Sequence, residues 1–198
     1  MIPRNKLDTR QFRKLQEFKT EEENEYTVRG YATKWAPYVL YEDADGPVYE
    51  RFGPDCFNGA DMSDVIFLYD HQGKVLARIS NGTLRVTIDD IGLYVEADLS
   101  KSEASREMYN EIKEGLVTKM SWSFMVGEYE YNQETRTIEH KSIRKMYDVS
   151  AVGIPANSDT EINARSFGDG VIAKTEAERL EVQRQKLKLA IELARSKK

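Results

Sequence analysis

Hydrophobic and polar residues alternate along two stretches of the chain that flank a polar turn at residues 89–92. An alternation of period two is typical of strands that bury one face, so the pattern predicts a β-hairpin over residues 83–99. The dipeptide Asn81-Gly82 predicts a tight turn just before it, and we therefore expect the strands to continue as a meander. The alternating apolar residues are Leu84, Val86, Ile88, Leu93, Val95, Ala97 and Leu99.

Several other short segments also have strand-like patterns. In the segment 120–126, Trp122 and Phe124 fall on one face, and Ser121 and Ser123 fall on the other. Many short strands with few helices favour a closed sheet, since closure removes exposed edges. The expected fold is therefore β-rich α+β, a closed antiparallel β-barrel flanked by helices. The further strands are predicted at residues 26–35, 48–52, 120–126, 137–143 and 147–154.

Two helices are predicted from capping residues and helical periodicity. Ser100 with Glu103 matches a capping box, and Gly115 is a suitable stop, which together indicate a helix of about three turns. Thr175 with Glu178 forms a second capping box, before a helix with one apolar stripe. That stripe could pack on the body, pair with another chain or stay in solvent, and periodicity does not decide among these. It consists of Leu180, Leu187 and Ile191.

Changes in composition along the chain predict its domain organisation. The first residues are dense in charge and indicate a loosely attached arm, and Gly168 with Gly170 indicates a linker. The predicted parts are a charged N-terminal arm (1–25), one domain (26–165), a linker (166–174) and a C-terminal amphipathic helix (175–198).

Charge and cysteine content restrict the functions that the chain can have. Its 29 Lys and Arg against 34 Asp and Glu give a net charge of −5, which repels phosphate backbones and anionic lipid. We therefore expect no nucleic-acid partner, and the absence of a long apolar window or an apolar start predicts no membrane span and no export. With one cysteine and two histidines, neither an internal disulfide nor a metal site is expected, and no cofactor-binding motif is found.

Five residues are candidates for chemistry. His71 follows an apolar run where a strand meets a loop, which suits a general base, although a lone histidine is more often a surface residue. Ser121 is a candidate nucleophile, but Ser123 shares its face, and both could be the solvated side of an amphipathic strand. Asp148 could orient His71 as the third member of a triad, and His140 is the alternative third member.

Cys56 with His71 would be the pattern of a cysteine protease. Cys56 lies beside a Gly-Pro pair and an aromatic residue, which is typical of a small buried side chain. The cysteine-protease interpretation is therefore set aside.

Several short motifs follow one another in a characteristic order and spacing. They are Gly30-Tyr-Ala32, residues 50–57, Leu68-Tyr-Asp-His71, Leu76-Ala-Arg78, Gly82-Thr-Leu84, residues 90–93, Met120-Ser-Trp-Ser-Phe124, Tyr147-Asp-Val-Ser150 and Ile154-Pro-Ala156. Their order and spacing resemble those of the prohead (capsid maturation) proteases of tailed bacteriophages. These serine peptidases are related in fold to the herpesvirus assemblins, a β-barrel wrapped by helices. Three residues depart from the family's usual pattern: Asp148 stands where it has Glu, Asp70 stands where it has Asn, and Ser123 is the small residue after the signature aromatic residue.

The resemblance implies a specific function. It implies that Ser121, rather than Ser123, is the nucleophile, that His71 is the general base and that Asp148 holds the acidic position. The expected substrate is the major capsid protein's scaffold segment or a separate scaffold protein, together with the enzyme itself, inside the immature prohead in the host cytoplasm. Dimerisation is carried over from the assemblins as an analogy. The alternative function is a non-catalytic capsid assembly or scaffolding factor built on the same barrel.

Overall fold

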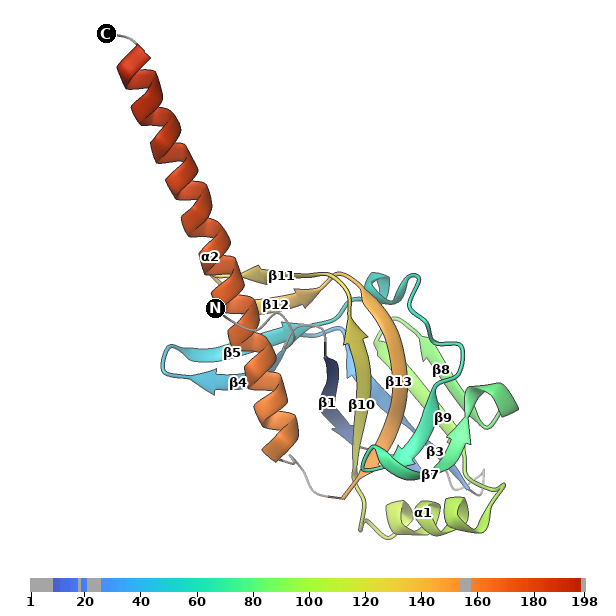
Figure 1. Cartoon of the computed structure of the whole chain (residues 1–198). Helices are drawn as coiled ribbons and strands as arrows, with labels where there is room; N and C mark the ends of the chain where they lie inside the picture. The colour runs from blue at the N-terminus through green and yellow to red at the C-terminus, as the bar shows by residue number, and fades with distance from the viewer. Residues whose placement is uncertain (1–8, 18, 21–25, 154–157, 197–198) are drawn as a thin grey trace.

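The computed structural model describes residues 9–17, 19–20, 26–153 and 158–196. Figure 1 shows a β-rich body from which one long helix extends. One sheet has five strands within these residues, and its middle strand β13 pairs antiparallel with β10 and parallel with β6. Residues far apart in the sequence therefore lie side by side. In spatial order its strands are β1 (Arg10–Glu17), β10 (Lys119–Val126), β13 (Ile143–Val152), β6 (Ile66–Tyr69) and β7 (Gln72–Arg78).

Two four-stranded sheets complete the described part of the body. The predicted hairpin is confirmed, because β8 pairs antiparallel with β9, and Leu93, Val95 and Ala97 of β9 are buried. In the other sheet β12 runs parallel to β5. The four-stranded sheet that contains the hairpin has the order β2 (Lys19–Thr20), β3 (Thr27–Lys34), β9 (Gly92–Asp98) and β8 (Leu84–Ile88). The other four-stranded sheet has the order β11 (Tyr129–Asn132), β12 (Thr137–His140), β5 (Gly46–Arg51) and β4 (Tyr38–Asp43).

The predicted closed antiparallel barrel is wrong. All three sheets of the described chain are open, and two of the strand pairs are parallel. Closure was expected because it removes exposed edges, but here other elements pack on the edge strands. Helix α2 and strand β3 pack against the edge strand β1, and helix α1 packs against the opposite edge strand β7.

Strand β10 is buried on both faces, which the alternation of its sequence did not predict. Trp122 and Phe124 form the expected apolar face, and they stack on each other and pack around Phe52. Ser121 and Ser123 on the other face are also buried. The expectation that these two hydroxyls are the solvated side of the strand is therefore wrong, because β10 lies inside the sheet between β1 and β13.

Helix α1 (Glu103–Lys113) confirms the first predicted helix with a different cap. The hydroxyl of Ser102, rather than that of Ser100, accepts a hydrogen bond from the backbone N–H of Ser105. The helix ends before Gly115, which has a positive φ of 74° that glycine adopts without strain. Two short 3₁₀ turns, η2 (Pro54–Phe57) and η3 (Ile79–Asn81), lie in connections between strands.

Helix α2 (Ser158–Ser196) is much longer than the sequence predicted. Residues 166–174, expected to be a linker, lie inside it, and the hydroxyl of Thr175 donates to the carbonyl of Val171 instead of capping a new helix. Gly168 has a packing role, since a Cβ there would lie 2.4 Å from the ring of Tyr41. The glycine thus permits close approach of the helix to β4. The last residue of the strand predicted at 147–154 lies outside the described residues.

Part of the predicted N-terminal arm is a strand of the main sheet. Strand β1 pairs antiparallel with β10 from Arg10–Met125 to Glu17–Lys119, and the side chains of Gln11 and Arg13 are buried. The segment was expected to be loosely attached because its residues are mostly polar, but the polar side chains find partners in the interior.

Candidate active site

Ser121 and Asp148 lie on neighbouring strands of the five-stranded sheet. Ser121 of β10 pairs with Ser150 of β13, and Ser123 pairs with Asp148. Paired residues of adjacent strands project from the same face of a sheet. The register therefore brings the two serines of β10 beside Ser150 and the carboxylate, and all four residues are buried.

His71 reaches this cluster from the hairpin turn between β6 and β7. The turn has two central residues, Asp70 and His71, whose φ angles are 45° and 61°. A two-residue hairpin favours positive φ at both positions, usually with Asn and Gly. Because residues other than glycine rarely adopt this conformation, a histidine there indicates a position selected for its side chain.

Two hydrogen bonds to neighbouring strand β13 fix the turn that carries His71. The backbone N–H of Asp70 donates to the carbonyl of Ala151 at 2.9 Å, and the backbone N–H of His71 donates to Ser150 Oγ at 3.1 Å. The position of the imidazole therefore depends on the parallel pairing of β6 with β13.

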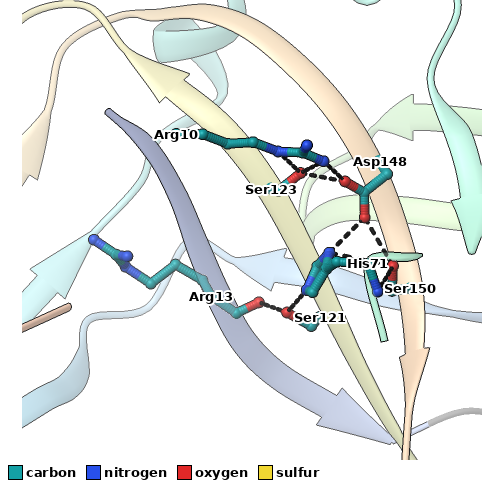
Figure 2. Close-up of polar contacts among 7 residues, drawn as sticks. All are labelled: Arg10, Arg13, His71, Ser121, Ser123, Asp148 and Ser150. Carbon is teal, nitrogen blue, oxygen red and sulfur yellow. Dashed lines mark hydrogen bonds and ion pairs between the residues drawn. The ribbon is translucent and has the colours of Figure 1, made fainter. Parts of the chain in front are cut away.

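Three of the predicted residues form a continuous chain of hydrogen bonds (Figure 2). Asp148 Oδ1 lies 2.6 Å from His71 Nδ1, and His71 Nε2 lies 2.7 Å from Ser121 Oγ. With Nδ1–H donating to the carboxylate, the lone pair of Nε2 points to the serine hydroxyl. This is the arrangement in which an imidazole takes the proton of a serine. The His71 side chain is 14% exposed, so the site reaches the protein surface at this histidine.

The Asp148 carboxylate is held ionised in the interior. Burial alone would raise the pKa of Asp148, but hydrogen bonds and charge from His71, with the hydroxyls of Ser123 and Ser150, lower it below its ordinary value. Ser150 Oγ donates to Oδ1 at 2.8 Å, and Arg10 and Ser123 both contact Oδ2. An ionised carboxylate can stabilise a protonated imidazole, which is the role that Asp148 was predicted to have.

Strand β1 contributes three contacts to the cluster that sequence reasoning missed. Arg10 forms an ion pair with Asp148 and donates from Nε to Ser123 Oγ at 2.8 Å. The ring of Phe12 packs edge-on against His71, with centroids 4.7 Å apart. No local signal could have found these contacts, since Phe12 and His71 are 59 positions apart and Arg10 and Asp148 are 138 apart.

The third contact of β1 concerns the serine proton itself. Ser121 Oγ donates to the backbone carbonyl of Arg13 at 3.0 Å, while His71 Nε2 lies 2.7 Å away on the same oxygen. A hydroxyl has one proton, so it can be given either to the carbonyl or to the imidazole. Proton transfer to His71 therefore requires the hydroxyl to rotate from Arg13 to the imidazole.

His140, the alternative third member, belongs to a different cluster. Its Nε2 lies 2.7 Å from Glu50 Oε1, its ring stacks on Phe52, and it makes no hydrogen bond to Ser121 or His71. The carboxylate of Glu50 also accepts from Arg13 Nη2 at 2.8 Å. Burial would raise the pKa of Glu50, but the charges of Arg13 and His140 hold it far below its ordinary range.

The buried ion pair in this second cluster holds strand β1, which contacts Ser121 and His71 in the active site. We expect Glu50→Ala to lower the free energy of unfolding by about 3–5 kcal/mol, because Arg13 would be left buried without its carboxylate. Urea unfolding followed by circular dichroism measures the change. The control is Arg85→Ala in the exposed pair with Glu96, which we expect to cost less than about 1 kcal/mol. Equal effects of the two variants would contradict this assignment.

The other candidates for chemistry have no place in the cluster. Cys56 is buried in η2, and burial raises the pKa of its thiol to about 12, so the thiolate needed for nucleophilic attack is not formed at neutral pH. Within the described residues no three His, Cys, Asp or Glu side chains group together as metal ligands. None of the described helices is both long and apolar enough to span a membrane.

Comparisons with known proteins agree with the chemistry of the cluster. The family model of the caudovirus prohead serine proteases matches residues 13–175, which is most of the chain and includes Ser121, His71 and Asp148. A search of curated proteins and a search of solved structures each gave no match. The family model covers far more than half of the sequence, and this coverage is the ground for assigning the chain to the family. The serine, histidine and carboxylate of the site agree with that assignment. The chain therefore belongs to the family of caudovirus prohead serine proteases.

Proposed function

We propose that this protein is the serine endopeptidase that cleaves scaffold or capsid protein during maturation of a phage prohead, and that it also cleaves itself. The observation that carries the proposal is the chain of hydrogen bonds from Asp148 through His71 to Ser121 in a member of this family. The substrate is the major capsid protein's scaffold segment or a separate scaffold protein. The enzyme acts inside the immature prohead in the host cytoplasm.

The proposed reaction is acyl transfer through Ser121. His71 Nε2 takes the hydroxyl proton as Oγ attacks the carbonyl carbon of the scissile peptide, and the carbonyl electron pair moves to its oxygen. The ionised Asp148 stabilises the imidazolium that forms. His71 then gives the proton to the leaving amine, which departs as the C–N bond breaks. Water next attacks the acyl-enzyme with His71 again as base, which releases the acid and restores Ser121.

The composition supports an enzyme whose partners are proteins. The net charge of −5 disfavours binding to nucleic acid, so the chain is expected to be free of the genome that later fills the shell. The proposal therefore includes neither nucleic acid nor membrane as a partner.

Co-expression with the capsid protein, and with the scaffold protein where it is separate, tests the proposal. We expect intact-mass spectrometry to find a shortened capsid or scaffold protein whose new terminus is absent without the protease. A serine-directed phosphonate added to the purified enzyme should label one site, located in the peptide that contains Ser121. Uncut substrate together with an unlabelled, folded protein would instead favour the non-catalytic assembly factor.

Self-cleavage is tested by the mass of the purified chain alone. We expect wild-type protein to lose a terminal segment on storage, while the same protein treated with the phosphonate keeps its full mass. Full mass in both samples would contradict self-cleavage. It would not bear on cleavage of the capsid or scaffold protein, which the co-expression experiment tests.

A further inference from the structure

The second half of helix α2 extends beyond the body of the protein (Figure 1). Its first half is packed, since Ala164, Phe167 and Val171 are buried and the helix contacts β1, β4 and β11. From Glu176 to Arg195 every residue is exposed. About half of this 39-residue helix is therefore exposed to solvent, and its Arg179 donates to Gln133 of the body at 3.3 Å.

The exposed half contains a regular apolar seam. Leu180, Leu187 and Ile191 are 59%, 63% and 44% exposed. With about 3.6 residues per turn they lie on one face of the helix. Together with Ala177, Arg184 and Ala194 they are spaced alternately three and four residues apart, which is the spacing of the a and d positions of a coiled coil. The seam consists of Ala177, Leu180, Arg184, Leu187, Ile191 and Ala194.

The charges of this half are divided between its two ends. The first turns carry mainly acidic residues, and the last turns carry mainly basic ones. A parallel partner helix of the same sequence would place like charges together, whereas an antiparallel one places acidic turns beside basic turns. The acidic residues at the start are Glu176, Glu178 and Glu181, with Arg179. The basic residues toward the end are Arg184, Lys186, Lys188, Arg195, Lys197 and Lys198, with Glu192.

We propose that residues 176–196 of α2 dock on the same segment of a second copy of this chain, as an antiparallel two-helix coiled coil. In the antiparallel register four of the six seam positions meet apolar side chains, because Leu180 meets Ile191 of the second copy and Ala177 meets its Ala194. The two central positions meet each other, and the aliphatic stem of Arg184 covers Leu187 of the second copy while its guanidinium reaches solvent. Beside the seam, Glu181 lies next to Lys188 of the second copy, and the symmetry repeats this pair.

A second apolar stripe on the opposite side of the helix fits this register less well. Val182, Leu189 and Leu193 continue the face that packs on the body, and they are also exposed beyond it. The same antiparallel register pairs Val182 with Leu189 on this stripe, but it places the carboxylate of Glu178 opposite Leu193, and Gln185 interrupts the stripe. The stripe thus has one kind of apolar layer, whereas the seam has two, Leu180 with Ile191 and Ala177 with Ala194. The seam through Leu180 is therefore assigned to the second copy, and the stripe through Leu189 offers a matched control.

Sedimentation equilibrium of the full-length chain tests the dimer. The measurement uses Ser121→Ala protein, so that loss of the helix by self-cleavage does not affect the result. We expect a dimer at micromolar concentration, and Leu180→Asp should weaken self-association at least about 100-fold, because each copy loses a leucine that packs on Ile191 of the other. Leu189→Asp, which places the same residue on the opposite stripe, should leave the dimer intact. A monomeric parent protein, or equal loss with both variants, would overturn the proposal.

Cysteine cross-linking tests the antiparallel orientation. In a mixture of Ala177→Cys and Ala194→Cys proteins we expect disulfide-linked heterodimers on mild oxidation, because these positions face each other. Each variant alone should stay unlinked, because identical positions lie at opposite ends of an antiparallel pair. The chain's own cysteine, Cys56, is buried and should not react. Efficient linkage within either single variant would show a parallel pairing and overturn the proposed geometry.

A charge exchange tests the flanking ion pair. Glu181→Lys should weaken the dimer several-fold by placing it beside Lys188 of the second copy, and adding Lys188→Glu to the same chain should restore it. Failure of the double variant to recover the association would contradict this register. If the helix binds only a capsid or scaffold protein, sedimentation shows a monomer and neither cross-links nor charge-dependent association are found. The protease activity does not depend on this result, because co-expression with the substrate tests it.

Discussion

Replacing Ser121 with alanine is expected to lower kcat for peptide cleavage about a million-fold while the fold is retained. The loss is this large because the hydroxyl supplies the attacking oxygen, and neither His71 nor Asp148 can act without it. The side chain is small and buried, and alanine removes two hydrogen bonds, the one to the carbonyl of Arg13 and the one to His71 Nε2. Cleavage of capsid or scaffold protein, followed by mass spectrometry, measures the change.

The matched control for this variant is Ser123→Ala, two residues along the same strand and on the same face. Ser123 contacts Asp148 but not the imidazole, so we expect its loss to reduce kcat no more than about tenfold. Thermal unfolding of both variants should resemble that of the wild type within about 1 kcal/mol. An active Ser121→Ala protein, or a Ser123→Ala protein that is equally inactive, would show that the nucleophile has been assigned to the wrong hydroxyl.

Replacing Asp148 with asparagine is expected to lower kcat about ten-thousand-fold. An asparagine amide can donate to His71 Nδ1, which would place the ring proton on Nε2 and remove the lone pair that accepts the proton of Ser121. The substitution keeps the volume of the side chain, and the amide oxygen can still accept from Ser123 and Arg10, while the Ser150 hydroxyl must turn to accept from the amide N–H. Initial rates with the capsid or scaffold substrate measure the effect.

The comparison that decides the third member of the triad uses His140→Gln. Glutamine keeps an N–H donor for Glu50, so the second cluster stays paired. We expect this variant to keep kcat within about tenfold of the wild-type value, because His140 has no bond to the imidazole of the site. A folded His140→Gln protein as inactive as Asp148→Asn would support a Ser-His-His arrangement instead.

Local patterns predicted about half of the described strands, and the resemblance to a family selected the three residues that the structure brings together. Alternation located the hairpin of β8 and β9, because the pattern is visible within the strands themselves. The residues alone left Ser121 and Ser123 equivalent, and the order of the family's motifs was needed to choose between them. The structure joins Ser121, His71 and Asp148 by hydrogen bonds.

The arrangement of the sheets could not be predicted in the same way. The barrel was inferred from the need to cover sheet edges, and the chain covers its edges by packing helices and a strand against them. The strand β1 and its contacts to the site depend on pairing with residues about a hundred positions away, for which local sequence carries no sign. Gly168 was misinterpreted because its role, room for Tyr41, is visible only once β4 and α2 are packed.

The position of β13 between β10 and β6 has a consequence for the order in which the protein is made. His71 and Ser121 are synthesised before residues 143–152, but no strand brings them together until β13 has been inserted between them. Pairings between distant segments form late in folding, since a large loop must close first. We therefore expect a nascent chain to carry the proposed nucleophile and base before they can act together, and to gain activity only when residues 143–152 have left the ribosome.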